Sequence, residues 1–244
     1  MSILKSLGKF AFEAAKSEIS NRAKKVRLAS EAVPITQDNM YSLKVGDFVR
    51  DTPAEQFYMV LRPKTTTDDG VLAILNVTYL EWYYRLTYCP YSKTISDDGG
   101  CRIKTDAYNR SEGKYNTELI MDIYRKLESE EHDPWGCPPP INKFPAFDFV
   151  HRLRDNAYVP AIEELYELFI NADLKRRLIF LINKCQQDSI PEDENIKIWS
   201  STDNNNPNRF DEDALSIMIG PNITPIVQSI RKAEKAYVIP FKKF

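Results

Sequence analysis

The residues best suited to chemistry in this sequence form a polar segment near the C-terminus, Asp203-Asn-Asn-Asn-Pro-Asn-Arg-Phe210. Four asparagines, one arginine and one aromatic residue fall within these eight positions. Asparagine both donates and accepts hydrogen bonds, and an aromatic ring adds rigid contact area, so the composition suits contact with a partner better than bond-making. We therefore predict a ligand-binding site, with Tyr237 close to it, made of Asp203, Asn204, Asn205, Asn206, Asn208, Arg209 and Phe210.

Groups that would carry catalysis are few. His151 lies on a segment with helical periodicity, where a partly buried structural histidine is the more common role, and His132 lies among acidic residues. Glu163 and Glu164 are adjacent, and neighbouring residues on a helix do not face one another. The sequence has no nucleophile elbow, phosphate-binding loop or dinucleotide fingerprint. We predict that the protein is not an enzyme, has no catalytic residue and uses no cofactor.

The cysteines do not have the spacing of a metal site. Cys89, Cys101, Cys137 and Cys185 are scattered, and no Cys-x-x-Cys pair occurs among them. Free thiols in a reducing compartment are the favoured interpretation, and a Cys89–Cys101 disulfide is the alternative. Asp97-Asp-Gly99 and Asp203-Asn-Asn205 offer oxygen ligands for calcium, but neither has the spacing of an EF-hand. We predict no metal site.

Composition narrows the class of protein. The 244 residues are 43% hydrophobic, which is enough for one large domain or for one domain with an appendage. The formal net charge of −2 gives no basic field for nucleic acid, so we expect no nucleic-acid partner. An apolar run of about eighteen residues, as a membrane-spanning helix needs, is missing. The N-terminus lacks the apolar core of a secretion signal, and Ser2 replaces the glycine needed for myristoylation, so we predict a cytoplasmic protein.

Residues 2–29 are predicted to form one amphipathic helix with Ser2 as its N-cap. One face is apolar and the other carries lysines, and Pro34 ends the pattern. Three alternatives stay open: the helix docks on its own or another subunit, frays in solution, or lies on a membrane surface. The apolar face is rich in alanine, which makes membrane contact the least favoured. The apolar residues are Ile3, Leu4, Leu7, Phe10, Ala11, Ala14, Ala15 and Ile19.

From residue 41 the sequence alternates between strand and helix patterns. Short runs rich in β-branched or aromatic residues predict strands at 57–61, 71–77, 197–200, 214–219, 226–231 and 237–241. Apolar spacing predicts helices from Thr117, as a cap, to Glu131, over 145–155, and from Pro160, with a continuation over 173–185. Strands, then helices, then strands again indicate an α+β domain with mainly antiparallel pairing and two to three helices.

Five short motifs between residues 41 and 244 resemble, in order, those of the Lcl-type C-terminal domain family. Lys44-Val-Gly-Asp47 is similar to the family's opening turn, and Glu112-Gly-Lys-Tyr-Asn-Thr117 to the beginning of its first helix. Tyr158-Val-Pro-Ala-Ile-Glu-Glu-Leu165 resembles the segment that opens its second helix. Trp199-Ser-Ser-Thr-Asp203 is similar to its Tyr-Trp-Ser-Ser-Thr strand, and Tyr237–Phe244 to its terminal strand. The family usually has Trp, Ser and Arg where this chain has Tyr158, Ala161 and Ile239.

The resemblance implies a C-type-lectin fold whose exposed face binds a ligand. In several such proteins a diversity-generating retroelement varies the binding side chains by adenine-directed mutagenesis, and asparagine codons are rich in adenine. The chain is thus similar to variable proteins of bacteria or phages. Formylglycine-generating enzymes share the fold but depend on a cysteine pair in the C-terminal part, and this sequence has no cysteine after Cys185. In the family pattern Trp199 belongs mainly to the core.

These inferences combine into one expectation. Residues 1–35 form an amphipathic helix and linker, and residues 41–244 form a C-type-lectin-like ligand-binding domain. The C-terminal segment is predicted to bind an unidentified protein or glycan, with Phe210 as the anchor, Arg209 as the charged donor and the asparagines as adaptable contacts. The alternative is a structural or assembly protein that acts through self-association or partner docking of residues 2–29.

Overall fold

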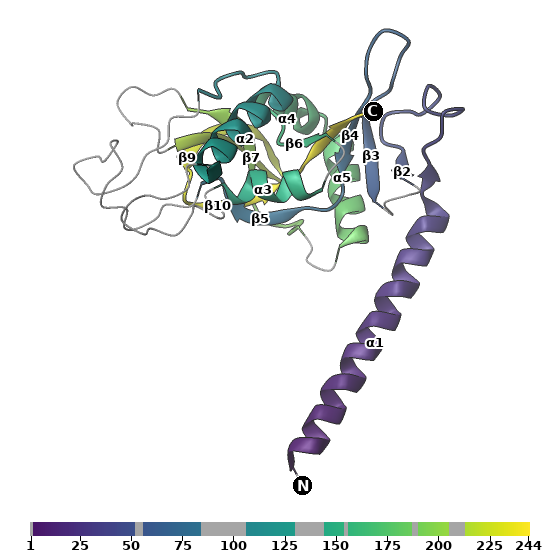
Figure 1. The fold of residues 1–244 in the computed structure, drawn as a ribbon. Helices are drawn as coiled ribbons and strands as arrows, with labels where there is room; N and C mark the ends of the chain where they lie inside the picture. The colour runs from purple at the N-terminus through teal and green to yellow at the C-terminus, as the bar shows by residue number, and fades with distance from the viewer. Residues whose placement is uncertain are drawn as a thin grey trace, which may run out of the picture.

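The computed structural model describes residues 2–51, 56–83, 106–129, 144–153, 156–186, 190–204 and 213–244. The structure combines two mixed sheets with five helices over these ranges (Figure 1). The strand pairs are seven antiparallel and two parallel among the described residues. The α+β class with mainly antiparallel pairing is therefore confirmed.

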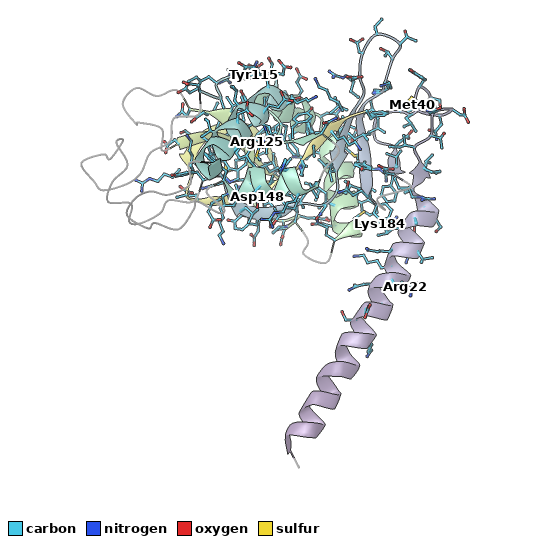
Figure 2. All side chains as sticks on the ribbon, in the orientation of Figure 1. Arg22, Met40, Tyr115, Arg125, Asp148 and Lys184 are labelled. Carbon is cyan, nitrogen blue, oxygen red and sulfur yellow. The ribbon has the colours of Figure 1, made fainter. Side chains whose placement is uncertain are left out.

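The predicted N-terminal helix is confirmed as α1 (Ser2–Glu31). Only its last turns join the body of the protein: Leu28 is 4% exposed in the main core, and Lys24 Nζ donates to the Gln186 carbonyl at 2.9 Å. Glu31 forms an ion pair with Lys184. The earlier turns stand away from the body, and Figure 2 shows Arg22 on this projecting part. Over the described residues, no helix combines the length and apolar character needed to cross a bilayer.

The first sheet joins the strands that follow α1 to the last strand of the chain. Its strand order is β1 (Val33–Pro34), β2 (Phe48–Arg50), β3 (Phe57–Arg62), β4 (Val71–Ile74), β11 (Phe241–Lys243) and β6 (Ala157–Tyr158). β1 pairs in parallel with β2, so the chain after α1 is part of the sheet. The predicted strands at 57–61 and 71–77 are confirmed in position as β3 and β4, and the second of them ends earlier, at Ile74.

The second sheet carries the C-terminal strands. Its order is β5 (Thr78–Glu81), β10 (Lys235–Val238), β7 (Ile196–Asp203), β8 (Asp213–Gly220) and β9 (Ile223–Arg231). The prediction of a single strand at 237–241 is wrong, because β10 ends at Val238 and β11 begins in the other sheet at Phe241. Pro240 lies between them and has no backbone donor to continue a ladder, while its carbonyl accepts from the Ile74 N–H at 2.8 Å.

Four helices follow α1 within the described residues, where two to three were predicted. They are α2 (Gly113–Ser129), α3 (Pro145–Arg152), α4 (Ile162–Ile170) and α5 (Ala172–Cys185). The predicted third helix divides because the Asn171 side chain accepts from the N–H groups of Asp173 and Leu174 and so caps a new helix. Thr117 does not cap α2, which begins one turn earlier at Gly113.

Helices pack against both faces of the second sheet. On one face α4 and α5 cover Ile198 and Ile217, and the same cluster reaches strands β3 and β4 of the first sheet. On the other face α2 and α3 cover Trp82 and Trp199, both 0% exposed. The core role predicted for Trp199 is confirmed, and its indole Nε1–H donates to the Leu80 carbonyl at 2.9 Å.

Candidate functional site

The predicted binding segment leaves the sheet from a buried ion pair. Asp203 ends β7, and its carboxylate Oδ2 accepts from Lys232 Nζ at 2.7 Å, with side-chain exposures of 0% and 3%. The ammonium also lies 4.6 Å from the ring centroid of Trp82. Asp203 was predicted as a ligand contact, but its side chain is enclosed by the core. Its geometry gives it the role of fixing where the segment begins.

Further hydrogen bonds fix both ends of the segment to β9. The Asn204 N–H donates to Asp203 Oδ1 at 2.8 Å and to the Asp213 carbonyl at 3.3 Å. The Asn204 amide Nδ2 donates to Ser229 Oγ at 2.8 Å, and that hydroxyl donates to Asp213 Oδ2 at 3.1 Å. The two residues that flank positions 205–212 are therefore held by a shared polar cluster on one strand.

The described structure does not bring the other predicted binding residues together beside Asp203 and Asn204. Asn205, Asn206, Asn208, Arg209 and Phe210 lie outside the described residues. Tyr237 lies opposite Ile198 in the sheet. Ile198 comes five residues before Asp203 on β7, so Tyr237 is about 16 Å from Asp203 along the strand direction. Tyr237 instead contacts Tyr79, with ring centroids 5.0 Å apart. Sequence reasoning missed Lys232 and Tyr79, neither of which belongs to a recognisable motif.

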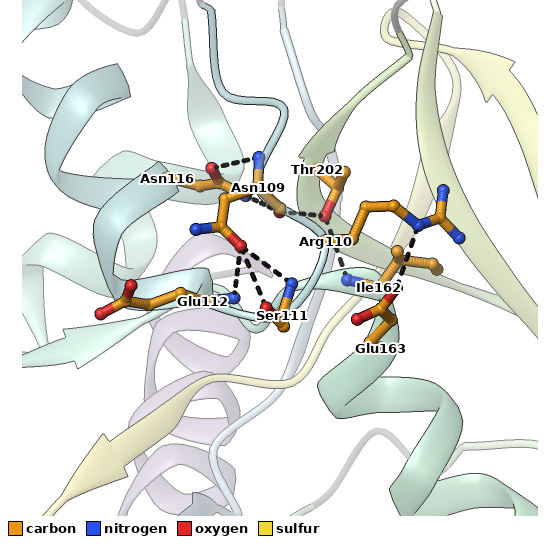
Figure 3. Close-up of polar contacts among 8 residues, drawn as sticks. All are labelled: Asn109, Arg110, Ser111, Glu112, Asn116, Ile162, Glu163 and Thr202. Carbon is orange, nitrogen blue, oxygen red and sulfur yellow. Dashed lines mark hydrogen bonds and ion pairs between the residues drawn. The ribbon is translucent and has the colours of Figure 1, made fainter.

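Three of the sequence motifs meet at one end of the second sheet (Figure 3). The Ile162 N–H donates to Thr202 Oγ1 at 3.1 Å, and that hydroxyl donates to the Asn109 carbonyl at 3.0 Å. The Asn109 N–H in turn donates to Asn116 Oδ1 at 3.1 Å. The hydroxyl of Thr117 accepts from the Val159 N–H at 3.0 Å. The motifs thus satisfy one another's buried polar groups, which gives them a structural role.

Glu164 closes the same end of the fold. Its Oε2 accepts from the N–H groups of Gly113 at 3.0 Å and Ala161 at 2.8 Å, and Oε1 accepts from the Tyr158 hydroxyl at 3.0 Å. The approach is close, because a Cβ at Gly113 would lie 2.4 Å from the Ala161 nitrogen. Burial raises the pKa of the Glu164 carboxyl above its usual range, against the lowering effect of these hydrogen bonds. Burial and the neighbouring Glu164 likewise raise the pKa of Tyr158.

Two substitutions of Glu164 distinguish the contribution of its hydrogen bonds from the contribution of its charge. Glu164→Ala leaves two backbone donors without their acceptor and is expected to lower the free energy of unfolding by roughly 2–3 kcal/mol. Glu164→Gln keeps an acceptor and removes the charge. Because the folded pKa is raised, the carboxyl's contribution is fully present below its ordinary value of 4.5 and is lost as pH rises through the folded value. Urea unfolding from about pH 4 to pH 7 should therefore favour the Gln variant increasingly over the parent. A pH-independent difference would contradict the assignment.

A groove on the helical face is lined by His151, which the sequence offered as a possible catalytic group. It encloses about 740 Å³ between α2, α3 and β6, and His151 and Glu118 both line it. Among the described residues, His151 forms neither a hydrogen bond nor an ion pair with a carboxylate. The cations of the groove have acidic neighbours on their own helices: Arg125 pairs with Asp122 at 2.7 Å and Arg152 with Asp148 at 2.5 Å. The groove thus brings His151 and Glu118 to one open space, and no hydrogen bond joins these two side chains in the described structure.

The cysteine and metal predictions rest mainly on residues beyond the described part. Cys89, Cys101 and Cys137 lie outside it, as do His132 and Asp97-Asp-Gly99. Cys185 is a free, half-buried thiol, and burial raises its pKa to about 11, so it is protonated and unreactive near neutral pH. Within the described ranges no group of three or more His, Cys, Asp or Glu side chains is placed to hold a metal ion.

Comparison with known proteins adds little to this geometry. No family model matches the chain, and no curated protein matches it. A fimbrial protein from Bacteroides ovatus is similar in structure, with 15% sequence identity and a TM-score of 0.46 over 72% of this chain. The chain spans 36% of the length of that protein. A similarity at this level carries no argument about function.

Proposed function

We propose that the protein is a non-enzymatic binding protein that presents residues 204–210 to a protein or glycan ligand. The observation that supports this proposal is the fixed base of the segment. A rigid frame that carries a polar and aromatic loop reduces the ordering entropy lost on binding. Asn204 is the described member of the contact set, and Asn205, Asn206, Asn208, Arg209 and Phe210 complete it in sequence. No cofactor or metal takes part in this function.

The proposed fold is a C-type-lectin-like domain related to the Lcl-type C-terminal family, in a variable protein of bacterial or phage origin. Two features support it. Three of the five motifs that carry the resemblance meet in space, and the segment rich in asparagine follows directly from the Trp199-Ser-Ser-Thr strand. A reverse transcriptase gene beside a near-copy of the coding 3′ end would establish diversification. We propose that the protein acts in the cytoplasm and that nucleic acid is not a partner.

Replacing both Arg209 and Phe210 by alanine is expected to abolish ligand recovery and leave stability nearly unchanged, within about 0.5 kcal/mol. Arginine and aromatic anchors carry most of the binding free energy in recognition loops. Recovery of ligand from cell extracts measures binding, and thermal unfolding measures stability. The matched control replaces Arg125 and Tyr115, which are exposed on α2, by alanine. Parent-like recovery by the loop variant would contradict the proposal.

A structural or assembly role through α1 is the second candidate. The helix carries seven basic and three acidic residues between positions 2 and 31, and its first turns stand off the body (Figure 1). In the same recovery experiment, a chain that begins at residue 21 keeps the Lys24 and Leu28 contacts with the body. If α1 makes the important contact, the truncated chain recovers less partner or has a different oligomeric mass in light scattering. The Arg209 and Phe210 double variant then behaves like the parent in both measurements.

A further inference from the structure

Two tyrosines, one exposed and one partly buried, lie in the second sheet away from the end of β7 at Asp203. Tyr79 on β5 and Tyr237 on β10 are directly opposite each other in the antiparallel pair. Their rings lie 5.0 Å apart at 54°, and Tyr79 is 52% exposed. On the same face of this sheet Ile198 is covered by the main core. Tyr237 packs against the edge of this core, and Tyr79 beside it is exposed, so the two rings form an aromatic platform at the edge of the core, defined as Tyr79 and Tyr237.

The platform forms one wall of a hollow of about 370 Å³. The segment from Pro191 to Lys197 and the turn at Glu234–Lys235 form the other walls. This segment approaches the β8–β9 turn closely, because a Cβ at Gly220 would lie 1.9 Å from Asn195 Oδ1. The close packing fixes the wall in place. The volume lies within the usual range of small-ligand sites, which begins at about 300 Å³.

The charges around the hollow are nearly balanced. Lys197 Nζ pairs with Glu234 at 3.0 Å, and Lys235 Nζ pairs with Glu81 at 3.6 Å. Glu194, which also lines the hollow, makes no ion pair with any described residue. The lining has two lysines and two glutamates, and with Glu81 beside it the formal charges sum to only −1. A ligand with a large net charge would gain little here, whereas hydroxyl groups would find both donors and acceptors.

We propose that this hollow binds a neutral carbohydrate, with one sugar ring lying on the Tyr79–Tyr237 platform. The C–H groups on one face of a pyranose carry slight positive charge, and the aromatic face is negative, so the two surfaces attract and exclude water. The sugar hydroxyls point outward to the rim, where Glu194, Glu234 and Lys197 accept or donate charge-assisted hydrogen bonds. The site is separate from the loop of the proposed function and does not depend on it.

A second hollow extends the site. It encloses about 390 Å³ and shares Pro191, Glu194 and Ile196 with the first. Phe180 on α5 lines it and is 52% exposed, which offers a second aromatic contact. A carbohydrate longer than one unit would cross Pro191 and reach this ring. Longer neutral oligosaccharides are therefore expected to bind more tightly than single sugars.

The test uses the full chain on an array of neutral gluco-, manno- and galacto-oligosaccharides beside sialylated and sulfated glycans. The best neutral oligosaccharide is then titrated by calorimetry. We expect Tyr79→Ala to weaken its Kd by at least about tenfold, which equals loss of one aromatic contact of about 1.4 kcal/mol. Tyr79→Phe keeps the ring and should stay within about threefold of the parent, and Phe180→Ala should weaken only the longer sugars.

Tyr115→Ala is the matched control, because Tyr115 is 49% exposed on α2, on a separate part of the surface (Figure 2). The proposal is overturned if no neutral glycan binds, if anionic glycans are preferred, or if Tyr79→Ala binds like the parent. It is also overturned if the Arg209 and Phe210 double alanine variant abolishes the glycan binding, since the sugar would then occupy the loop. Binding retained by that double variant and lost by Tyr79→Ala supports the hollow, whatever ligand the loop takes.

Discussion

Replacing Lys232 by methionine is expected to lower the free energy of unfolding by about 3–5 kcal/mol, although the change preserves most of the side-chain volume. The Lys232 ammonium lies 2.7 Å from Asp203 Oδ2, and both side chains are nearly fully buried. Methionine leaves the Asp203 carboxylate in the core without its partner and removes the cation–π contact with Trp82. Chemical denaturation in urea, monitored by circular dichroism, measures the loss.

A second substitution shows whether the loss comes from the stranded charge. Asp203→Asn keeps an acceptor for the Asn204 N–H and removes the charge, so Lys232→Met with Asp203→Asn should recover part of the stability lost by Lys232→Met alone. Lys235→Ala is the surface control, because its pair with Glu81 is half exposed and should change stability by less than about 1 kcal/mol. A Lys232→Met variant as stable as the Lys235→Ala control would contradict the buried pair.

The same pair shows where reasoning from sequence ends. Lys232 lies between Arg231 and Ala233, next to the turn that follows β9, and a basic residue in such a place is normally solvated. Its burial depends on Asp203 and Trp82, which are far away in sequence and meet it only when the second sheet forms. No local pattern carries this information. Tyr79 was missed for the same reason, since its partner Tyr237 lies on a strand 158 positions later.

Local patterns predicted the elements well where one periodicity was clear. The amphipathic spacing after Ser2 gave α1, and the β-branched runs gave β3, β8 and β9. The predicted ends of helices and strands were wrong where a capping side chain or a proline determined them. Asn171 divided α4 from α5 through its cap, and Pro240 separated β10 from β11. The candidate site was predicted from the composition of the segment and from the family resemblance, neither of which shows that the Asp203 side chain is buried.

The meeting of the motifs has a physical consequence for the segment proposed to bind the ligand. Thr202 bonds to the N-terminus of α4, and Ser201 N–H donates to the Pro160 carbonyl at 2.8 Å, so the end of β7 is tied to a helix. The Asp203 N–H donates to the Ala107 carbonyl at 2.8 Å on the other side. The strand that leads into the proposed binding segment is therefore fixed by helix, loop and sheet together.

Replacing Trp199 by alanine is expected to lower the free energy of unfolding by about 3–5 kcal/mol, the usual loss for truncating a buried tryptophan. The side chain is 0% exposed in the cluster beneath α2 and α3, and its indole N–H donates to the Leu80 carbonyl at 2.9 Å. Alanine opens a cavity and leaves that carbonyl without its donor. Trp199→Phe keeps much of the packing and loses the donor, so its loss should be smaller, roughly 1–2 kcal/mol. Urea unfolding of both variants measures these differences.

Ligand binding separates the core role of Trp199 from a contact role. Substitution of a core residue lowers stability but leaves the binding surface intact. Trp199→Phe should therefore bind the ligand of the proposed segment as the parent does, at a temperature where both proteins are folded. Tyr115→Ala, at a 49% exposed position, serves as the control and should change stability by less than about 0.5 kcal/mol. If Trp199→Phe lost binding while keeping parent stability, the indole would be acting at the ligand. The buried Nε1 bond to Leu80 argues for the opposite result, because a ligand would have to displace β5 to reach it.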